Sequence, residues 1–199
     1  GEVTTGHLTA NGSSSATIRV NAATSIDTGD LTATSSGGEA EISIFAGNSY
    51  SGYTATAITT GDLTAASSGD ENQADISIYS GNTYSGYGAD IDVGDITVTA
   101  DNGDVRFEAR TGGAVQIASA LLETGQDGGG AYGNLTGEFI VTAGDDIAIG
   151  VDVMGDFQPG SVTVNTRNDF AGESYGTSIG SRAQIVIRSQ EGSVVAGNL

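Results

Sequence analysis

The chain has 199 residues and a formal net charge of −19, from 25 acidic and 6 basic residues. This charge argues against nucleic acid and anionic membrane surfaces as partners, because both repel an acidic protein. The sequence has no cysteine, which excludes disulfides, thiol catalysis and zinc thiolate sites. No stretch approaches the ~20 apolar residues needed for membrane insertion.

A five-residue phrase, Gly-Asp-Leu-Thr-Ala at residues 29–33, organises the chain. It returns unchanged at residues 61–65 and with changes at residues 6–10 and 94–98. Weaker copies follow, so that repeats are predicted to start near Gly6, Gly29, Gly61, Gly94, Gly113, Gly137, Gly160 and Gly192. Repeats of this size indicate stacked supersecondary units, and we interpret residues 1–199 as a single domain.

Each copy alternates apolar and polar residues, which is the period of a β-strand. The first apolar position of each copy forms a predicted inward column: Leu8, Leu31, Leu63, Ile96, Val115, Phe139, Val162 and Val194. A second strand follows in most repeats, at residues 18–20, 42–45, 76–79, 105–107, 147–149 and 185–187. A third strand closes some repeats, and only residues 118–123 suggest a short helix. The pattern predicts an all-β fold, a parallel β-solenoid (β-helix) of about seven rungs with glycine at the corner before each first strand.

Tyrosine-bearing loops interrupt the repeats. Residues 47–53 and 81–87 are two versions of one Gly- and Tyr-rich insertion, and later loops add further tyrosines. The candidate interaction residues are Tyr50, Tyr53, Tyr84, Tyr87, Tyr132 and Tyr175. Because tyrosine buries a large face and keeps a polar tip, these loops are expected to contact another subunit or a surface glycan, or to pack on their own rung.

The chain begins and ends within a repeat. Residues 2–5 match the closing strand of a rung, and residues 192–196 match an opening strand. Unpaired strand edges template pairing with another chain. We therefore expect Val3 and Thr4 at one end, and Val194 and Val195 at the other, to stack subunits end to end, or to continue into a longer array.

Acidic residues recur at one corner of the repeats. Asp30, Asp62 and Asp95 would lie one strand spacing apart, ~4.8 Å, and like charges this close repel unless they face water or share a cation. Asp101 and Asp104 form a second cluster. Oxygen ligands on flexible loops suit Ca²⁺, which makes these five residues a candidate calcium site and Ca²⁺ the one candidate cofactor.

No catalytic set is evident. The single histidine, His7, occupies the position that aspartate holds in later repeats, so we interpret it as a corner residue and not as a general base. The one adjacent acidic pair, Asp145 and Asp146, lies in a predicted turn. The sequence therefore predicts a protein that is not an enzyme, although paired carboxylates could serve a glycosidase.

Three stretches carry a resemblance to a known family: Gly-Asp-Leu-Thr-Ala-Thr at residues 29–34, Gly-Asp-Ile-Thr-Val-Thr-Ala at residues 94–100, and Gly-Asp-Val at residues 103–105. They resemble the repeats of filamentous-haemagglutinin-type adhesins and autotransporter passenger domains. The resemblance implies a right-handed parallel β-helix, bacterial secretion, and a role in adhesion or biofilm.

Two functions are therefore expected. The first is an extracellular structural protein of the cell surface, either a subunit of an end-to-end filament or a segment of a long fibrous adhesin, which associates with itself. The alternative is a carbohydrate- or Ca²⁺-binding module of a bacterial surface protein. Quenching of tyrosine fluorescence by a glycan would favour the second, and sedimentation as a polymer would favour the first.

Overall fold

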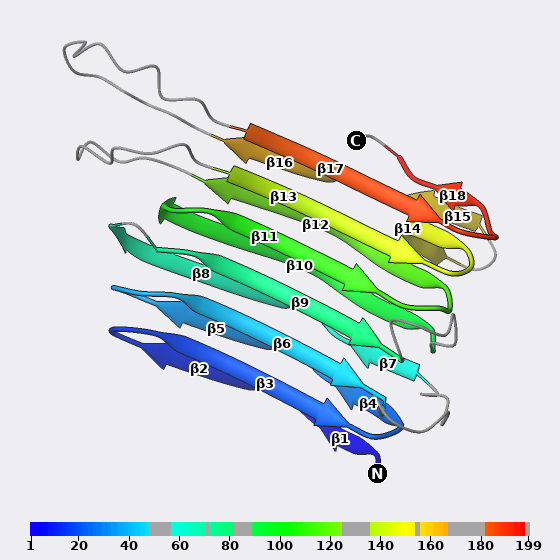
Figure 1. The fold of residues 1–199 in the computed structure, drawn as a ribbon, viewed down its shortest axis with the longest axis horizontal. Helices are drawn as coiled ribbons and strands as arrows, with labels where there is room; N and C mark the ends of the chain where they lie inside the picture. Colours follow the sequence, from blue (N-terminus) through cyan, green and yellow to red (C-terminus); the bar gives the residue numbers. More distant parts are fainter. Residues whose placement is uncertain are drawn as a thin grey trace.

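The structure, a computed structural model, describes residues 1–47, 57–70, 72–81, 89–124, 136–153, 156–166 and 182–197. These residues form strands and turns without a helix (Figure 1). The strands are β1 (Val3–Thr5), β2 (Leu8–Gly12), β3 (Ala16–Ala22), β4 (Ser25–Thr28), β5 (Leu31–Ser35), β6 (Ala40–Ala46), β7 (Ala57–Thr60), β8 (Leu63–Asp70), β9 (Ala74–Ser80), β10 (Ile91–Asn102), β11 (Val105–Arg110), β12 (Val115–Thr124), β13 (Thr136–Ala143), β14 (Ile147–Val153), β15 (Asp156–Pro159), β16 (Val162–Thr166), β17 (Arg182–Ser189) and β18 (Val194–Val195).

Two layers of parallel strands make up the fold. The first sheet joins β1, β4, β7, β10, β12 and β14 in that order, with β2, β5, β8, β16 and β18 also paired into it. The second sheet has the order β3-β6-β9-β11-β13-β17. Figure 1 shows the strands following one another in chain order from the blue N-terminal end to the red C-terminal end. The pair β14–β15 is antiparallel. The predicted all-β, parallel-strand character is confirmed.

The repeated phrase places like residues beside one another. Leu8, Leu31, Leu63 and Ile96 pair in register across the first sheet, as the predicted column requires. In the second sheet Ile18, Ile42 and Ile76 pair in the same way. Their side chains point between the sheets. Those after the first repeat are essentially inaccessible to solvent: Leu31, Leu63, Ile96, Ile42 and Ile76. Burial of this continuous apolar layer stabilises the stack, at about 25 cal/mol per Å² of apolar surface.

The later repeats depart from the predicted register. Val115 pairs with Ile91 and Ile147, not with Ile96, because β12 runs through both strand positions of the first sheet. Ile96 instead faces Ala120, which pairs with Val162. The residues predicted as a helix lie inside β12.

Two further copies of the phrase occupy other positions. Phe139 lies in the second sheet, paired with Phe107 and Ile185, and Val194 pairs with Ile147 in the first sheet. Ile147, predicted in a second strand, therefore belongs to the first sheet. Strand residues do follow Gly113, Gly137 and Gly192, but these residues do not occupy the first-strand position that the repeat predicted. A glycine followed by alternating apolar residues marks any strand after a turn, so the pattern fits both sheets. The second sheet holds six strands among the described residues, against about seven predicted rungs.

In the part of the chain that the structure describes, no helix is long and apolar enough to cross a membrane.

Candidate functional site

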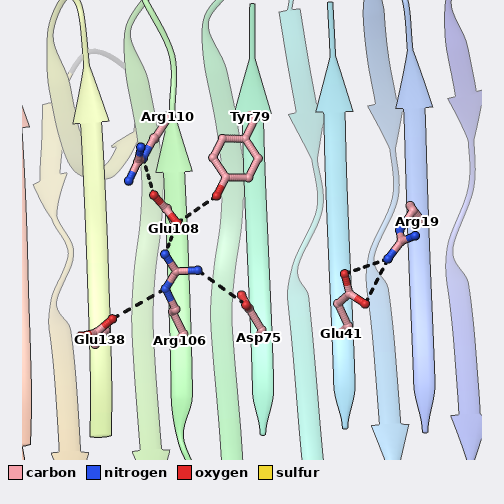
Figure 2. Close-up of polar contacts among 8 residues, drawn as sticks. All are labelled: Arg19, Glu41, Asp75, Tyr79, Arg106, Glu108, Arg110 and Glu138. Carbon is pink, nitrogen blue, oxygen red and sulfur yellow. Dashed lines mark hydrogen bonds and ion pairs between the residues drawn. The ribbon is translucent and has the colours of Figure 1, made fainter. Parts of the chain in front are cut away.

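Charged side chains gather on the outward face of the second sheet. Strand alternation sends Glu41, Asp75, Arg106 and Glu138 to this face, and the parallel register sets them side by side on β6, β9, β11 and β13. Glu108 and Arg110 follow Arg106 on β11 and point to the same face (Figure 2). We call Asp75, Tyr79, Arg106, Glu108, Arg110 and Glu138 the charged cluster.

Glu108 lies at the centre of the charged cluster. Its side chain is 2% exposed and forms ion pairs with the guanidinium groups of Arg106 and Arg110. Tyr79 donates its hydroxyl hydrogen to Glu108 Oε2 at 2.9 Å. Glu108 Oε1 meets Arg110 as an ion pair but without hydrogen-bond geometry. Burial, and then this hydrogen bond, raise the pKa of Tyr79. Two cations therefore compensate one buried carboxylate.

Arg106 is also flanked by two looser carboxylates. Its Nη1 lies 3.7 Å from Asp75 Oδ2, and its Nε lies 3.7 Å from Glu138 Oε2. Asp75 Oδ1 is buried and has no hydrogen-bond partner among the described residues. Burial raises the pKa of the Asp75 carboxyl, and Glu41 and Glu108 add to this, while Arg106 opposes it.

A shallow cavity opens beside these three side chains, where β9, β11 and β13 begin. Its volume is about 270 Å³. It is lined by Gln73, Ala74, Asp75, Asp104, Val105, Arg106, Thr136 and Glu138. The Asp104 Oδ1 atom accepts the backbone N–H of Thr136 at 2.7 Å and so joins two neighbouring corners. The cavity presents several carboxylates beside one guanidinium, a mixture of hydrogen-bond acceptors and donors.

The predicted aspartate column forms, with an unexpected role. Asp30 Oδ1 accepts the backbone N–H of Asp62 at 3.0 Å, and Asp62 Oδ1 accepts that of Asp95 at 2.9 Å. Asp95 Oδ1 then accepts the Ser119 hydroxyl at 2.7 Å. Asp30 and Asp62 thus each satisfy a backbone N–H of the next repeat, whereas Asp95 binds a side chain. Among the described residues, no group of three or more Asp, Glu, His or Cys side chains is arranged to hold a metal ion.

His7 begins this aspartate column. Its Nδ1 lies 3.1 Å both from the Asp30 backbone nitrogen and from Asp30 Oδ2. A neutral Nδ1 can accept from the nitrogen, whereas a protonated Nδ1 would pair with the carboxylate, so one protonation state cannot serve both contacts. His7 lies between β1 and β2, at the corner of the repeat that the sequence pattern predicted for it.

The aspartate column also explains the glycines before it. A Cβ at Gly94 would overlap Asp62 Oδ1 and lie 3.0 Å from the Gly61 carbonyl carbon. Among the described glycines, positive φ occurs at Gly47, Gly81 and Gly150, and not at these corners. The glycine therefore leaves room for the carboxylate of the preceding repeat, whereas the sequence suggested that it was needed for a sharp turn.

The other predicted site residues have different outcomes. Tyr50, Tyr53, Tyr84, Tyr87, Tyr132 and Tyr175 lie outside the described residues. Within the part of the chain that the structure describes, Val3 and Thr4 pair only with β4, and Val194 and Val195 pair only with β14. Asp101 is exposed and lies three residues from Asp104, in the strand before the turn.

Sequence reasoning missed the charged cluster. The alternation Arg106-Phe107-Glu108-Ala109-Arg110 does signal three charges on one strand face. Its partners on β9 and β13, about thirty residues away in either direction, emerge only from the strand register. Comparison of the chain with protein-family models, with curated proteins and with solved structures finds no match.

Proposed function

We propose that the chain winds as a parallel β-solenoid and acts as an extracellular structural protein of the cell surface. It would serve as a subunit of an end-to-end filament or as a segment of a long fibrous adhesin, in adhesion or biofilm. One observation carries the proposal: the backbone ladders and the apolar columns continue to both ends of the stack. β3 pairs only with β6, and β17 pairs only with β13, among the described strands.

The two ends match each other in register. Extending the second sheet by one more strand would place Ala183 of β17 on Ala16 of β3, Ile185 on Ile18, and Ile187 on Val20. These pairs continue the apolar columns. In the first sheet, Val194 would meet Val3; Val194 and its neighbour Val195 are each 46% exposed.

The outward residues at such a junction are compatible. Directly opposed pairs would be Gln184 with Thr17, Val186 with Arg19, and Arg188 with Asn21. Like charges that face each other directly destabilise a strand pair, and none of these three pairs opposes two like charges. The same surfaces would join two subunits of a filament or two segments of one long array.

The function proposed for the chain is to hold a shape and not to catalyse a reaction. The acidic surface favours solubility of a long assembly, and the Tyr-bearing insertions would offer lateral contacts to other subunits or to surface glycans. A Ca²⁺ site at Asp30, Asp62, Asp95, Asp101 and Asp104 stays a prediction.

Electron microscopy of the purified protein tests the proposal. We expect filaments at high protein concentration from the parent and from Gln184→Lys, whose changed side chain points outward. Ile185→Lys, which puts a charge into the junction core, should give single rods of roughly 29 Å, six strands at ~4.8 Å each. Samples with millimolar Ca²⁺ and with chelator test the calcium prediction through filament growth and the thermal midpoint.

Single rods from the parent at every concentration would contradict end-to-end stacking. Filaments that form equally well from Ile185→Lys would contradict the proposed register. Circular dichroism of each variant shows that it has kept its strands.

A further inference from the structure

The cavity beside Arg106 has the features of a small binding site. It lies where three neighbouring strands of the second sheet begin, and its walls come from three successive repeats. At about 270 Å³ it is just below the ~300–1,000 Å³ typical of sites for drug-sized ligands, so it suits one small unit. Unlike most such sites, it is walled mainly by polar and charged side chains, which favours a ligand with many hydrogen-bonding groups.

The Arg106 guanidinium is held on one side by Glu108, its neighbour on the same face of β11. The buried Glu108 carboxylate binds its Nη2, and Tyr79 in turn donates to that carboxylate (Figure 2). Since the guanidinium is fixed from one side, its Nη1 and Nε present hydrogens in set directions toward Asp75 and Glu138. A positioned donor of this kind orients a ligand without being reorganised by it.

A hydroxyl group can bridge Arg106 to the carboxylate on either side of it. The distances of 3.7 Å to Asp75 and to Glu138 are too long for direct hydrogen bonds. A hydroxyl oxygen that lies to one side of such a pair, within reach of both atoms, accepts from the guanidinium and donates to the carboxylate, as a bridging water would.

Charge excludes acidic ligands from this cavity. Asp75, Asp104 and Glu138 face one guanidinium, whose charge is already shared with Glu108. A uronate, sulfate or phosphate group would therefore meet net repulsion. A simple ammonium ion would be attracted by the carboxylates but would meet Arg106 at the centre of the site and leave its two directed donors unused.

We propose that this cavity, between Asp75, Arg106 and Glu138, binds one neutral hexopyranose ring, such as a terminal or branch unit of a glycan. Adjacent ring hydroxyls would bridge Arg106 to Asp75 on one side and to Glu138 on the other. The site lies on the outward face of the second sheet, away from the strand edges that end-to-end stacking uses, so it does not depend on the proposed assembly.

Saturation-transfer difference NMR with the full chain tests this site, because it works for single rods and for long assemblies alike. The probes are the methyl glycosides of glucose, galactose and mannose. We expect at least one to bind with a millimolar Kd, and Asp75→Asn and Glu138→Gln each to weaken it by about tenfold, the loss of one well-placed hydrogen bond. Glu41→Gln, on the same face but outside the cavity, is the matched control and should stay within about twofold.

Two further probes examine the charge argument. Methyl glucuronide should bind more weakly than methyl glucoside, and n-butylammonium should not compete with the neutral glycoside. The proposal is overturned if no glycoside shows saturation transfer, if all three variants weaken binding equally, or if n-butylammonium binds and displaces the sugar. Thermal midpoints of the variants establish that each has folded, since both cavity substitutions conserve shape.

Discussion

The strands β1–β9, here called the regular region, and the strands β11–β17, the divergent region, use the same two sheets in different ways. In the regular region, identical residues pair across repeats: Leu31 with Leu63, Ser43 with Ser77, and Ile44 with Ile78. In the divergent region the equivalent positions change size and charge. Phe107 stacks on Phe139 with ring centroids 5.2 Å apart.

The difference is sharpest on the outward face of the second sheet. The column that begins with Arg19 continues as Ser43 and Ser77 in the regular region, then as Glu108 and Ile140 in the divergent region. Small hydroxyl side chains need no partner from a neighbouring strand, whereas a buried carboxylate requires compensating cations. Regular repeats extend the stack, and the local chemistry from which a site can be built arises where the divergent repeats meet β9.

Core truncation should separate the two regions most strongly. Ile76→Ala removes a fully buried side chain between Ile42 and Phe107, and we expect a loss of about 2–5 kcal/mol in the free energy of unfolding. Ile185→Ala, in the same column but at the end of the stack and partly buried, should cost less than half as much. Urea unfolding at low protein concentration measures both.

The same pair of variants also links stability to assembly. If copies stack end to end, Ile185 becomes buried, and the cost of Ile185→Ala should rise with protein concentration while that of Ile76→Ala stays constant. Equal costs at low concentration would show that the end of the stack is as well packed as its middle, contrary to the partial burial of Ile185.

The corner glycine Gly94, in β10 where the two regions join, should matter through the carboxylate of the preceding repeat. Gly94→Ala displaces Asp62 Oδ1 from the Asp95 backbone N–H, and we expect a loss of about 0.5–1.5 kcal/mol. Gly6→Ala is the matched control, because a Cβ there meets nothing within 4 Å. That substitution should be neutral or slightly stabilising, since it restricts the unfolded chain. The shift in urea midpoint is the measurement.

A double substitution distinguishes this explanation from a general effect of alanine. In an Asp62→Ala background, the hydrogen bond is already absent, so Gly94→Ala should cost clearly less than it does in the parent. Strict additivity of the two losses would mean that the glycine serves the backbone turn, as the sequence alone suggested.

These contrasts also show what could be predicted from the sequence. In the regular region, near-identical sequence repeats align in one way only, so the register of Leu8, Leu31 and Leu63 can be predicted from the sequence alone. In the divergent region, Val115 and Phe139 match the same pattern but belong to different strand positions. A one-dimensional period cannot tell the two sheets apart when both bury alternating apolar residues. The residues at 118–123 favour a helix by propensity, but pairing within the first sheet overrides it.

The candidate site was less predictable than the fold. Stacking of Asp30, Asp62 and Asp95 followed from the repeat, but the partner of each carboxylate depends on atomic positions: a backbone N–H for the first two and a serine hydroxyl for the third. The contact between Arg106 and Asp75 depends on a register that joins residues 31 positions apart. Sequence therefore indicated which residues could line up, and geometry determined what they do together.

At the boundary of the two regions, Asp75 should make stability depend on pH. Burial holds the pKa of this carboxyl above its ordinary value of 3.8, so the folded state keeps the proton to higher pH than the unfolded state. Stability that protonation confers is then lost as the pH rises from 3.8 through the folded-state pKa.

Asp75→Asn removes this loss, and its stability relative to the parent should increase across that window. The effect should be small, because the side chain is 36% exposed and solvent screens the charge. Asp27→Asn, on an outward position of the regular region, is the matched control for the loss of one carboxylate, and urea midpoints of all three proteins are measured from pH 3 to pH 8. An advantage of Asp75→Asn that shrinks with rising pH would instead mean that Arg106 outweighs burial at this carboxylate.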